Sequence, residues 1–366
     1  KNTKPPLFFW QGMISTENGN EWSLLNLRWP SLIYTALTAI LITIVAFSIS
    51  KSMSLGLLSG IVWLAFFNTY RYGRPYLAEP PEIFWLCLPF FMFLIVGKRL
   101  SESKYLFPIF AGVGFGFALL YKSVAYIVPV CIVLSLWYWQ WRSWRVLEFI
   151  RNDLIKIIAV GFIALAIFAL WFVLDPDPAA IWQEFVMGEN AGKFAARNTN
   201  YLKDFIWGGD SVGMLFLTSV ANAGLLSLVV INLFYVAIRD RKQMRFEEKL
   251  LWIWIIVFFI IFCLPSQRSG RYLLPIMPAI AILIALHWQQ LSKWCFWIAL
   301  VIQAILIIAF AWLSLHIDLW TYPIWHWLIL ALALGVIAIG LIRTAFTKSA
   351  AVLACFMTYL SLTSSI

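Results

Sequence analysis

The sequence predicts an all-α polytopic membrane protein, and three observations support this fold class. The chain has 366 residues, of which 63% are hydrophobic and only 12% are charged, whereas a soluble domain has roughly 25% charged residues. Apolar runs long enough to cross a hydrocarbon core, which takes about 17 to 25 residues in a helix, recur between charged or proline-rich breaks. These runs are continuous and lack the alternation of lipid-facing barrel strands, so helices are expected.

The apolar runs define twelve expected transmembrane helices. In hydrocarbon, each helix must satisfy its backbone hydrogen bonds within its own segment. We expect the ends of each segment to lie within about 2 to 4 residues of these bounds. The segments are 31–50, 54–70, 82–97, 105–121, 124–140, 155–174, 211–237, 250–264, 272–288, 294–314, 324–342 and 349–363.

The distribution of lysine and arginine predicts the orientation of the chain. More than half of the 27 basic residues fall in alternate loops, at 51, 98–104, 142–156, 239–249, 293 and 343–348. The positive-inside rule makes this face cytoplasmic. The first 30 residues, both chain ends and the loop around Arg268 then lie outside. The net charge of +10 is explained by loops anchored on an anionic membrane face, and no nucleic-acid partner is predicted.

Several cations lie on the outer face, where positive charge is disfavoured. The loop LPSQRSGRYLLPIMP, residues 264–278, carries Arg268 and Arg271 without an acidic neighbour. The other outer cations are Lys4 in KPPLFFW, Arg71 and Arg74 in YRYGRPYLAEPPE, and Lys122 in LLYKSVAY. Each could reach lipid headgroups on its own by snorkelling. As a set, these cations favour a bound anion embedded in the membrane.

Two carboxylates share this outer face. Glu79 and Glu82 flank two prolines at the start of a predicted helix, and a favourable charge at a helix N-terminus is a sufficient explanation for both. Beside Arg71 and Arg74, the two acids also describe a site that could handle a proton and a phosphate together.

The longest outer loop, 175–210, predicts an interfacial helix. The residues expected on its apolar side are Ile181, Trp182, Phe185, Val186 and Phe194. The residues expected near its polar edge are Glu189, Asn190 and Lys193. The amphipathic pattern is typical of a helix that lies in the membrane interface, and the aromatic content argues against disorder.

No metal site is predicted from the cysteines and histidines. The five cysteines, which are Cys87, Cys131, Cys263, Cys295 and Cys355, lie in apolar runs without metal-ligand or disulfide spacing. His316 and Asp318 share an outer loop, but aromatic-rich boundaries commonly hold histidine without a metal. The other two histidines are His287 and His326.

Three motifs, in order, resemble a family of lipid-linked-sugar glycosyltransferases. The first motif is KNTKPPLFFW followed by LRWPSLIYTALTA, the second is EFVMGENAGKF, and the third is LPSQRSGRYLLPIMPAIAILIA. Together they resemble motifs of the membrane-embedded C superfamily (GT-C). Within it, the motifs resemble the branch of the aminoarabinose transferases of lipid A and the protein O-mannosyltransferases. The resemblance covers about residues 1–290.

The resemblance implies an inverting glycosyltransferase that takes a sugar from a polyprenyl phosphate, undecaprenyl in bacteria. The acceptor, a lipid or a protein, would lie on the outer, periplasmic side of the cytoplasmic membrane. Lys4 matches a motif lysine near the lipid phosphate, and Arg268 and Arg271, with Tyr272 beside them, match a basic late loop that would stabilise the leaving phosphate. Arg71, Arg74 and Lys122 are further candidates for the same anion.

Two departures from the family pattern limit what the resemblance implies. The catalytic acid of the family precedes the K-P-P-L element, so we expect it upstream of Lys1, and Glu79 and Glu82 remain as second-loop acids that help to bind or orient the acceptor. Thr3 stands where many relatives have Glu, which puts a metal contact in doubt. No cofactor is firmly implied, and a divalent metal stays open as an alternative.

The expected organisation has three parts within a GT-C-like bundle. Residues 1–30 form the rest of a first outer loop, 31–290 the transmembrane glycosyltransferase core with outer loop 175–210 as a lid, and 291–366 the C-terminal transmembrane helices. Two other function classes stay open. A lipid or ion transporter would place charges at mid-membrane, and a non-catalytic scaffold would keep the fold without the acid.

Overall fold

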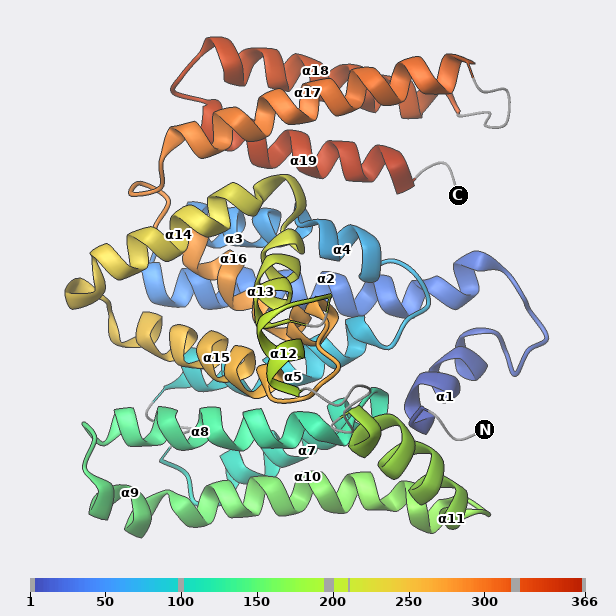
Figure 1. Cartoon of the computed structure of the whole chain (residues 1–366), viewed down its shortest axis with the longest axis vertical. Helices are drawn as coiled ribbons and strands as arrows, with labels where there is room; N and C mark the ends of the chain where they lie inside the picture. The colour runs from blue at the N-terminus through green and yellow to red at the C-terminus, as the bar shows by residue number, and fades with distance from the viewer. Residues whose placement is uncertain (1–3, 98–101, 194–200, 210, 317–322, 364–366) are drawn as a thin grey trace.

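The computed structural model of the chain is an assembly of helices stacked side by side (Figure 1). It describes residues 4–97, 102–193, 201–209, 211–316 and 323–363. All regular structure in these ranges is helical, which confirms the predicted all-α fold class. The first half comprises α1 (Pro6–Ser15), α2 (Leu24–Ser50), α3 (Met53–Leu64), α4 (Phe67–Tyr72), α5 (Glu79–Val96), α7 (Leu106–Tyr121), η1 (Val124–Tyr126), α8 (Ile127–Trp141), α9 (Val146–Asn152) and α10 (Leu154–Leu174).

The second half begins with short elements and continues with long helices. They are α11 (Pro178–Ala180), η2 (Ile181–Asn190), η3 (Ala191–Lys193), α12 (Tyr201–Ile206), α13 (Val212–Ala221), η4 (Gly224–Leu226), α14 (Ser227–Arg239), η5 (Arg241–Gln243), α15 (Phe246–Cys263), η6 (Gly270–Ile276), α16 (Met277–Leu286), α17 (Lys293–His316), α18 (Ile324–Ile342) and α19 (Thr347–Thr363).

The expected transmembrane segments are helical, but the count of twelve spans is not confirmed. Among the described residues, six helices are long and apolar enough to cross a membrane, and four shorter apolar helices accompany them. The segment predicted as one helix over 211–237 is instead α13 and α14, which meet at an angle of 112°. Gly224, at the break, has a positive φ of +63°, and an added Cβ there would lie 2.5 Å from both Phe67 and Tyr359. The backbone can therefore turn there only with glycine.

Small residues let the central helices approach closely. α7 packs between α5 and α10, and α5 packs on α2. Gly112 and Gly116 form a G-x-x-x-G face on α7, where an added Cβ would lie 2.7 Å from the Cβ of Ile163 and 2.8 Å from that of Ile167 on α10. Membrane helices associate largely through such close packing, because lipid tails are as apolar as the side chains.

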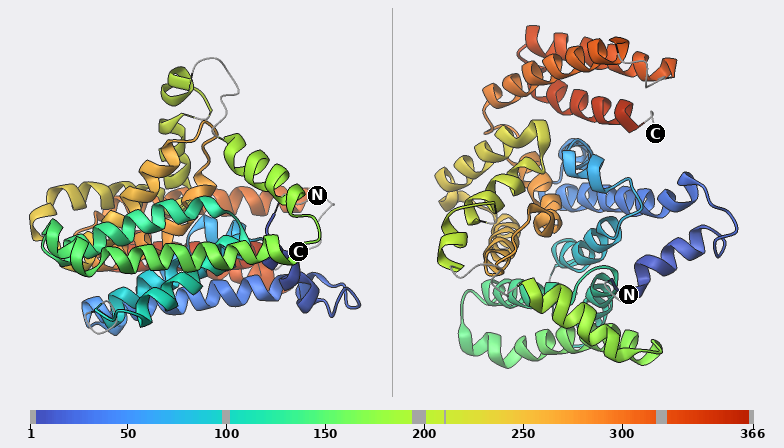
Figure 2. Two further views of the ribbon diagram at one scale, coloured as in Figure 1. Left: turned by 90° about the horizontal axis from the view of Figure 1, so that it is seen from below. Right: turned by 45° about the vertical axis from the view of Figure 1, so that its right-hand side comes forward.

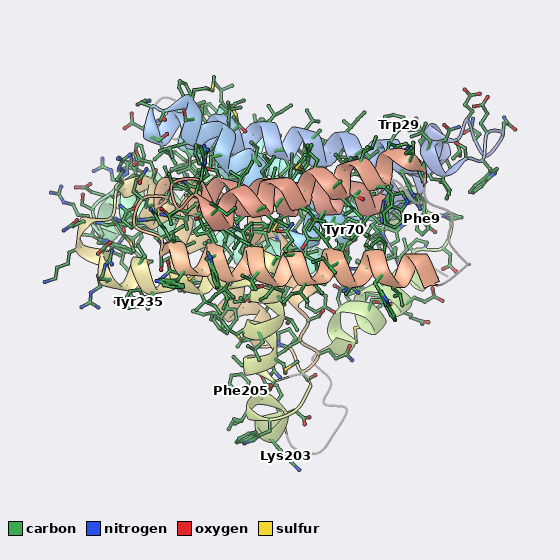
Figure 3. The ribbon with its side chains drawn as sticks, turned by 90° about the horizontal axis from the view of Figure 1, so that it is seen from above. Phe9, Trp29, Tyr70, Lys203, Phe205 and Tyr235 are labelled. Carbon is green, nitrogen blue, oxygen red and sulfur yellow. The ribbon has the colours of Figure 1, made fainter. Side chains whose placement is uncertain are left out.

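The C-terminal helices form a group at one end of the stack. α17, α18 and α19 pack on one another at the top of Figure 1 and meet the rest of the chain through α3, α4, η4 and α14. A second feature, α12 with α13, projects away from the helical body (Figure 2, left). Lys203 and Phe205 lie at the tip of this projection (Figure 3).

The segment predicted as an interfacial helix is helical, with a different buried face. Residues Ile181–Asn190 are wound as a π-helix. Ile181 and Phe185 are buried, and the ring of Phe185 lies 5.1 Å from that of Trp171 on α10. Trp182, which was predicted on the same side, is 55% exposed, because Ile181 and Phe185 occupy the buried face and consecutive residues of a helix point in different directions. Phe194 lies outside the described residues.

Candidate functional site

A cavity of about 810 Å³ opens where several helix ends meet. The start of α5, the end of α7, the η2–η3 segment and the loop from α15 into η6 surround it, and the N-terminal segment closes one side. Its charged lining residues are Lys4, Glu79, Lys122, Glu189 and Arg271. The chain therefore brings five charges from distant segments to one end of the helix bundle.

Two carboxylates lie at the start of α5, and one of them, Glu79, lines the cavity. Glu79 and Glu82 occupy the first turn of α5, where Pro80 and Pro81 start the helix, and their negative charge is favourable at the helix N-terminus. Both are buried, with relative exposures of 1% and 0%. A buried carboxylate is costly unless it is paired, so the cations around these two acids are required by the fold.

Lys122 is the first of these cations. It follows the last residue of α7, and its Nζ donates to Glu82 Oε2 at 2.8 Å and lies 3.4 Å from Glu79 Oε1. Burial disfavours the charged lysine, but the negative charges of Glu82 and Glu79 outweigh this effect and raise the pKa of Lys122 above its usual value. Lys122 is therefore an ammonium ion at neutral pH.

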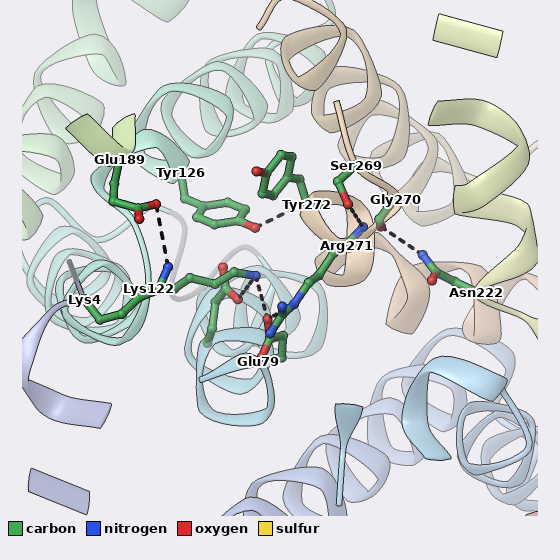
Figure 4. A network of polar contacts seen from close by, with 11 residues as sticks. Lys4, Glu79, Lys122, Tyr126, Glu189, Asn222, Ser269, Gly270, Arg271 and Tyr272 are labelled. Carbon is green, nitrogen blue, oxygen red and sulfur yellow. Dashed lines mark hydrogen bonds and ion pairs between the residues drawn. The ribbon is translucent and has the colours of Figure 1, made fainter. Parts of the chain in front are cut away.

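Arg271 is the second cation, and one side of it faces the cavity. Its Nε donates to Glu79 Oε1 (Figure 4). Its guanidinium lies 5.3 Å from the centre of the Tyr72 ring. The Arg271 side chain is 43% exposed and lines the cavity. A guanidinium carries five donors. Because only Nε is bonded to Glu79, Arg271 can still present a pair of donors to an anion.

Polar contacts fix the backbone around Arg271. Ser269 Oγ accepts a hydrogen bond from the Arg271 N–H at 3.3 Å, and the Asn222 amide donates to the Gly270 carbonyl at 3.0 Å (Figure 4). Tyr272 lines the cavity, and its carbonyl accepts from the Tyr126 hydroxyl at 3.3 Å. The loop is thus held by Asn222, which follows α13, and by Tyr126 of η1, so the position of Arg271 depends on the tertiary fold.

The N-terminal segment and the end of η2 meet across the cavity. Lys4 Nζ lies 3.9 Å from Glu189 Oε2, and both side chains are partly exposed. Ser123 donates to the Asn190 side-chain oxygen at 2.6 Å. The predicted site residues Lys4, Glu189 and Asn190 are therefore neighbours. The side chain of Lys193 lies outside the described residues.

The other predicted cations lie away from this cavity. Arg268 is buried, donates to the Cys263 carbonyl at 2.6 Å, and lies 4.9 Å from the Phe205 ring of α12. Arg71 is exposed and stacks on Tyr72 at 5.2 Å. Arg74 lies over the ring of Tyr70, in a different cavity. None of these three arginines lines the cavity that contains Arg271.

Tyr126 is a site residue that the sequence reasoning missed. Its ring lies 5.8 Å from Lys122 Nζ, and it is buried next to the two carboxylates. A signal was present in the motif YKSVAY, which places Tyr126 four residues after Lys122, about one helical turn.

The metal-ligating residue types do not gather in this cavity. Within the described part of the chain, no group of three or more His, Cys, Asp or Glu side chains could hold a metal ion. His287 lies 3.4 Å from Glu248, and His326 bonds to Ser361. The side chain of His316, and Asp318, lie outside the described residues.

The fold and the cavity together define a polytopic α-helical membrane protein with a charged cavity at one end of its helix bundle. The family model described as dolichyl-phosphate-mannose-protein mannosyltransferase matches residues 2–183. The undecaprenyl phosphate-alpha-4-amino-4-deoxy-L-arabinose arabinosyl transferase of Aeromonas hydrophila is 25% identical over 301 residues. This alignment covers 79% of the chain and 51% of the relative. The chain thus spans about half the length of the curated relatives it matches.

Solved structures show the same fold. The crystal structure of ArnT from Cupriavidus metallidurans in the apo state has a TM-score of 0.69 and 18% identity, and it covers the whole chain and 66% of ArnT. The structure of the same protein bound to undecaprenyl phosphate has a TM-score of 0.67 and 19% identity, with coverage of 99% and 66%. The chain therefore has the fold of these solved structures, and its sequence is similar to those of the aminoarabinose transferases and the O-mannosyltransferases, as the motifs predict.

Proposed function

We propose that the chain is the membrane-embedded core of an inverting glycosyltransferase that uses a polyprenyl-phosphate sugar donor. The observation that carries this proposal is the exposed side of Arg271, which faces a large cavity while Glu79 fixes its other side. The relatives named as undecaprenyl phosphate-dependent arabinosyl transferases support the same substrate class. The transfer, the donor and the acceptor are all part of the proposal.

The donor phosphate would bind between Arg271, Lys122 and Lys4. Arg271 would offer paired donors to two phosphate oxygens. Lys122 is 12% exposed and remains near the cavity floor, so it would add a fixed positive charge. Lys4 has a loose partner in Glu189 at 3.9 Å, and the lysine can turn to the anion at little cost. Tyr272 would line the same pocket.

The chemistry follows from this placement. A nucleophile of the acceptor attacks the anomeric carbon of the sugar, and the bond between that carbon and the phosphate oxygen breaks with inversion. The electron pair leaves with the polyprenyl phosphate, whose negative charge grows during the step, and Arg271 and Lys122 would stabilise it. The proton of the nucleophile goes to a carboxylate base. Glu79 and Glu82 would position the cations, since both already accept from Lys122 or Arg271.

We place the cavity on the outer face of the bacterial cytoplasmic membrane. The positive-inside rule assigns the opposite loops to the cytoplasm, and the relatives are bacterial. The outer loop would cover the cavity through Glu189 and Asn190 and shape the access of a lipid or protein acceptor. The charged cluster lies at the start of α5, at the end of α7 and at the start of η6, whereas a transporter is expected to hold its charges at mid-membrane.

Binding of undecaprenyl phosphate to the purified chain in detergent tests this proposal. Native mass spectrometry across a lipid titration should give a dissociation constant that rises at least tenfold in Arg271→Ala. Arg71→Ala is the matched control, because Arg71 stacks on the same Tyr72 ring and lies outside the cavity. Equal affinity of the wild type and a folded Arg271→Ala variant would overturn the proposal.

A further inference from the structure

A second cavity at the start of α2 contains two arginines of its own. Its volume is about 410 Å³, and it shares no lining residue with the cavity that contains Arg271. Arg28 on α2 and Arg74 on the link between α4 and α5 line it. The apolar part of the lining includes Leu24, Leu25, Leu32, Phe356 and Leu360. Positive charge beside exposed leucines describes an amphipathic site.

The position of Arg74 is fixed by close packing. Thr35 donates to the Gly73 carbonyl at 2.7 Å, and an added Cβ at Gly73 would lie 2.6 Å from the Thr69 carbonyl oxygen. The guanidinium of Arg74 lies 4.8 Å from the Tyr70 ring centre, and that ring stacks on Tyr359 of α19 at 5.2 Å. The arginine is therefore the end of a fixed stack and does not extend into solvent.

Arg74 is in an electrostatically unsatisfied environment. Its Nε and one terminal nitrogen are buried without a hydrogen-bond partner. Within the described residues, no carboxylate lies within 4 Å of Arg74 or Arg28. A partly buried guanidinium without a counter-charge is costly. Face-on stacking on an aromatic ring also leaves the donor edge of a guanidinium available to a planar or tetrahedral anion.

We propose that this cavity binds an anionic phospholipid of the membrane. The two arginines would hold the headgroup phosphate, and the exposed leucines on α2, with Phe356 and Leu360 on α19, would contact the acyl chains. In Figure 3, the label of Trp29 marks the part of α2 next to Arg28, and the label of Tyr70 marks the ring over which Arg74 lies. The site is independent of the proposed transferase activity. It would fix the link that precedes Glu79, because Arg74 lies five positions before that residue.

A titration with phosphatidylglycerol tests the proposal. Native mass spectrometry of the purified chain in a neutral detergent should show one tight phosphatidylglycerol site, whose dissociation constant rises at least fivefold in Arg74→Ala. Arg28→Gln, at a half-buried position, should have a similar effect and serves if the first variant fails to fold. Arg71→Ala and Arg271→Ala should leave this site unchanged, which separates it from the donor cavity.

Competing ligands identify the occupant. Phosphatidylcholine, which has no net charge, should not displace phosphatidylglycerol from the tight site. If a folded Arg74→Ala or Arg28→Gln variant binds phosphatidylglycerol with the same dissociation constant as the wild type, the proposal is overturned. Displacement by undecaprenyl phosphate or by inorganic phosphate at the same concentration would also overturn it, because the site would then select a polyprenyl chain or a bare anion.

Discussion

Arg271 donates to the carboxylate of Glu79, although 192 positions separate the two residues in the chain. Glu79 is buried, and the same oxygen lies 3.4 Å from Lys122. One carboxylate therefore joins η6, α5 and the end of α7 at the floor of the cavity. This shared acid positions both cations that we assign to the donor phosphate.

A double-mutant cycle should show coupling between Glu79 and Arg271. The single variants Glu79→Gln and Arg271→Ala each break the ion pair. The double variant should therefore lose less free energy of unfolding than the sum of the losses in the two single variants. We expect a coupling free energy of about 1 to 3 kcal/mol in unfolding by SDS in mixed micelles. The parallel cycle of Glu79 with Arg71 should give less than about 0.5 kcal/mol. A value that small for the first cycle would contradict the assigned pair.

The charge of Lys122 should make stability depend on pH in the alkaline range. Its pKa is raised, against the effect of burial, by Glu82 and Glu79. A raised pKa means that this stabilisation is fully present below the unfolded-state value of about 10.4 and is lost as the pH rises through the higher folded-state value. Lys122→Met leaves two buried carboxylates without their ammonium partner, which should cost about 3 kcal/mol at neutral pH.

The measurement is the unfolding midpoint of the wild type and Lys122→Met between pH 7 and roughly pH 11. The difference between the two proteins should shrink only at the upper end of this range, where the wild-type lysine loses its proton. A difference that is constant across the range would assign the effect of the substitution to packing alone.

The contact between α7 and α10 should not tolerate a methyl group at Gly116. The added Cβ would lie 2.8 Å from the Cβ of Ile167, which cannot move without its backbone. We expect Gly116→Ala to lower the free energy of unfolding by about 1 to 3 kcal/mol. Gly335→Ala on α18 is the matched control, because nothing lies within 4 Å of its added Cβ, and alanine there should be neutral or stabilising by up to about 1 kcal/mol. Equal thermal stability of the two variants would contradict this packing.

The sequence predicts the helices better than their breaks and partners. Runs such as 31–50 and 155–174 are predominantly apolar, so their helices follow from composition alone, and α2 and α10 confirm them. The turn between α13 and α14 cannot be predicted from composition, because it depends on the close approach of Phe67 and Tyr359 to Gly224. Hydropathy counts apolar residues and contains no information about such contacts.

The same limit applies to the site. Lys122, Glu79 and Arg271 stand out as charges at helix ends, and the fold brings them together. Arg268 and Arg271 are indistinguishable in the motif RSGR, yet one is buried beside α12 and the other faces the cavity. The backbone between the two arginines is held by Asn222, which donates to the Gly270 carbonyl, and Arg268 itself donates to the Cys263 carbonyl. Local sequence does not specify either contact.

Arg268 should stabilise the projecting α12 segment and leave donor binding intact. Its guanidinium lies 5.4 Å from the ring of Tyr201 and 4.9 Å from that of Phe205, and it donates to the Cys263 and Asp204 carbonyls at 2.6 and 3.4 Å. Truncation removes these hydrogen bonds and both ring contacts. We expect Arg268→Ala to speed cleavage within 201–209 by added protease at least fivefold.

The comparison with Arg271 separates the two arginines of this loop. Undecaprenyl phosphate should bind Arg268→Ala with an affinity within about twofold of the wild type, a difference of about 0.4 kcal/mol, whereas Arg271→Ala should lose at least tenfold without faster cleavage in 201–209. If Arg268→Ala instead loses lipid affinity as strongly as Arg271→Ala while α12 stays protected, then Arg268 turns toward the phosphate when the donor binds. The stacking between Arg268 and the aromatic rings of α12 would then belong to the lipid-free state alone.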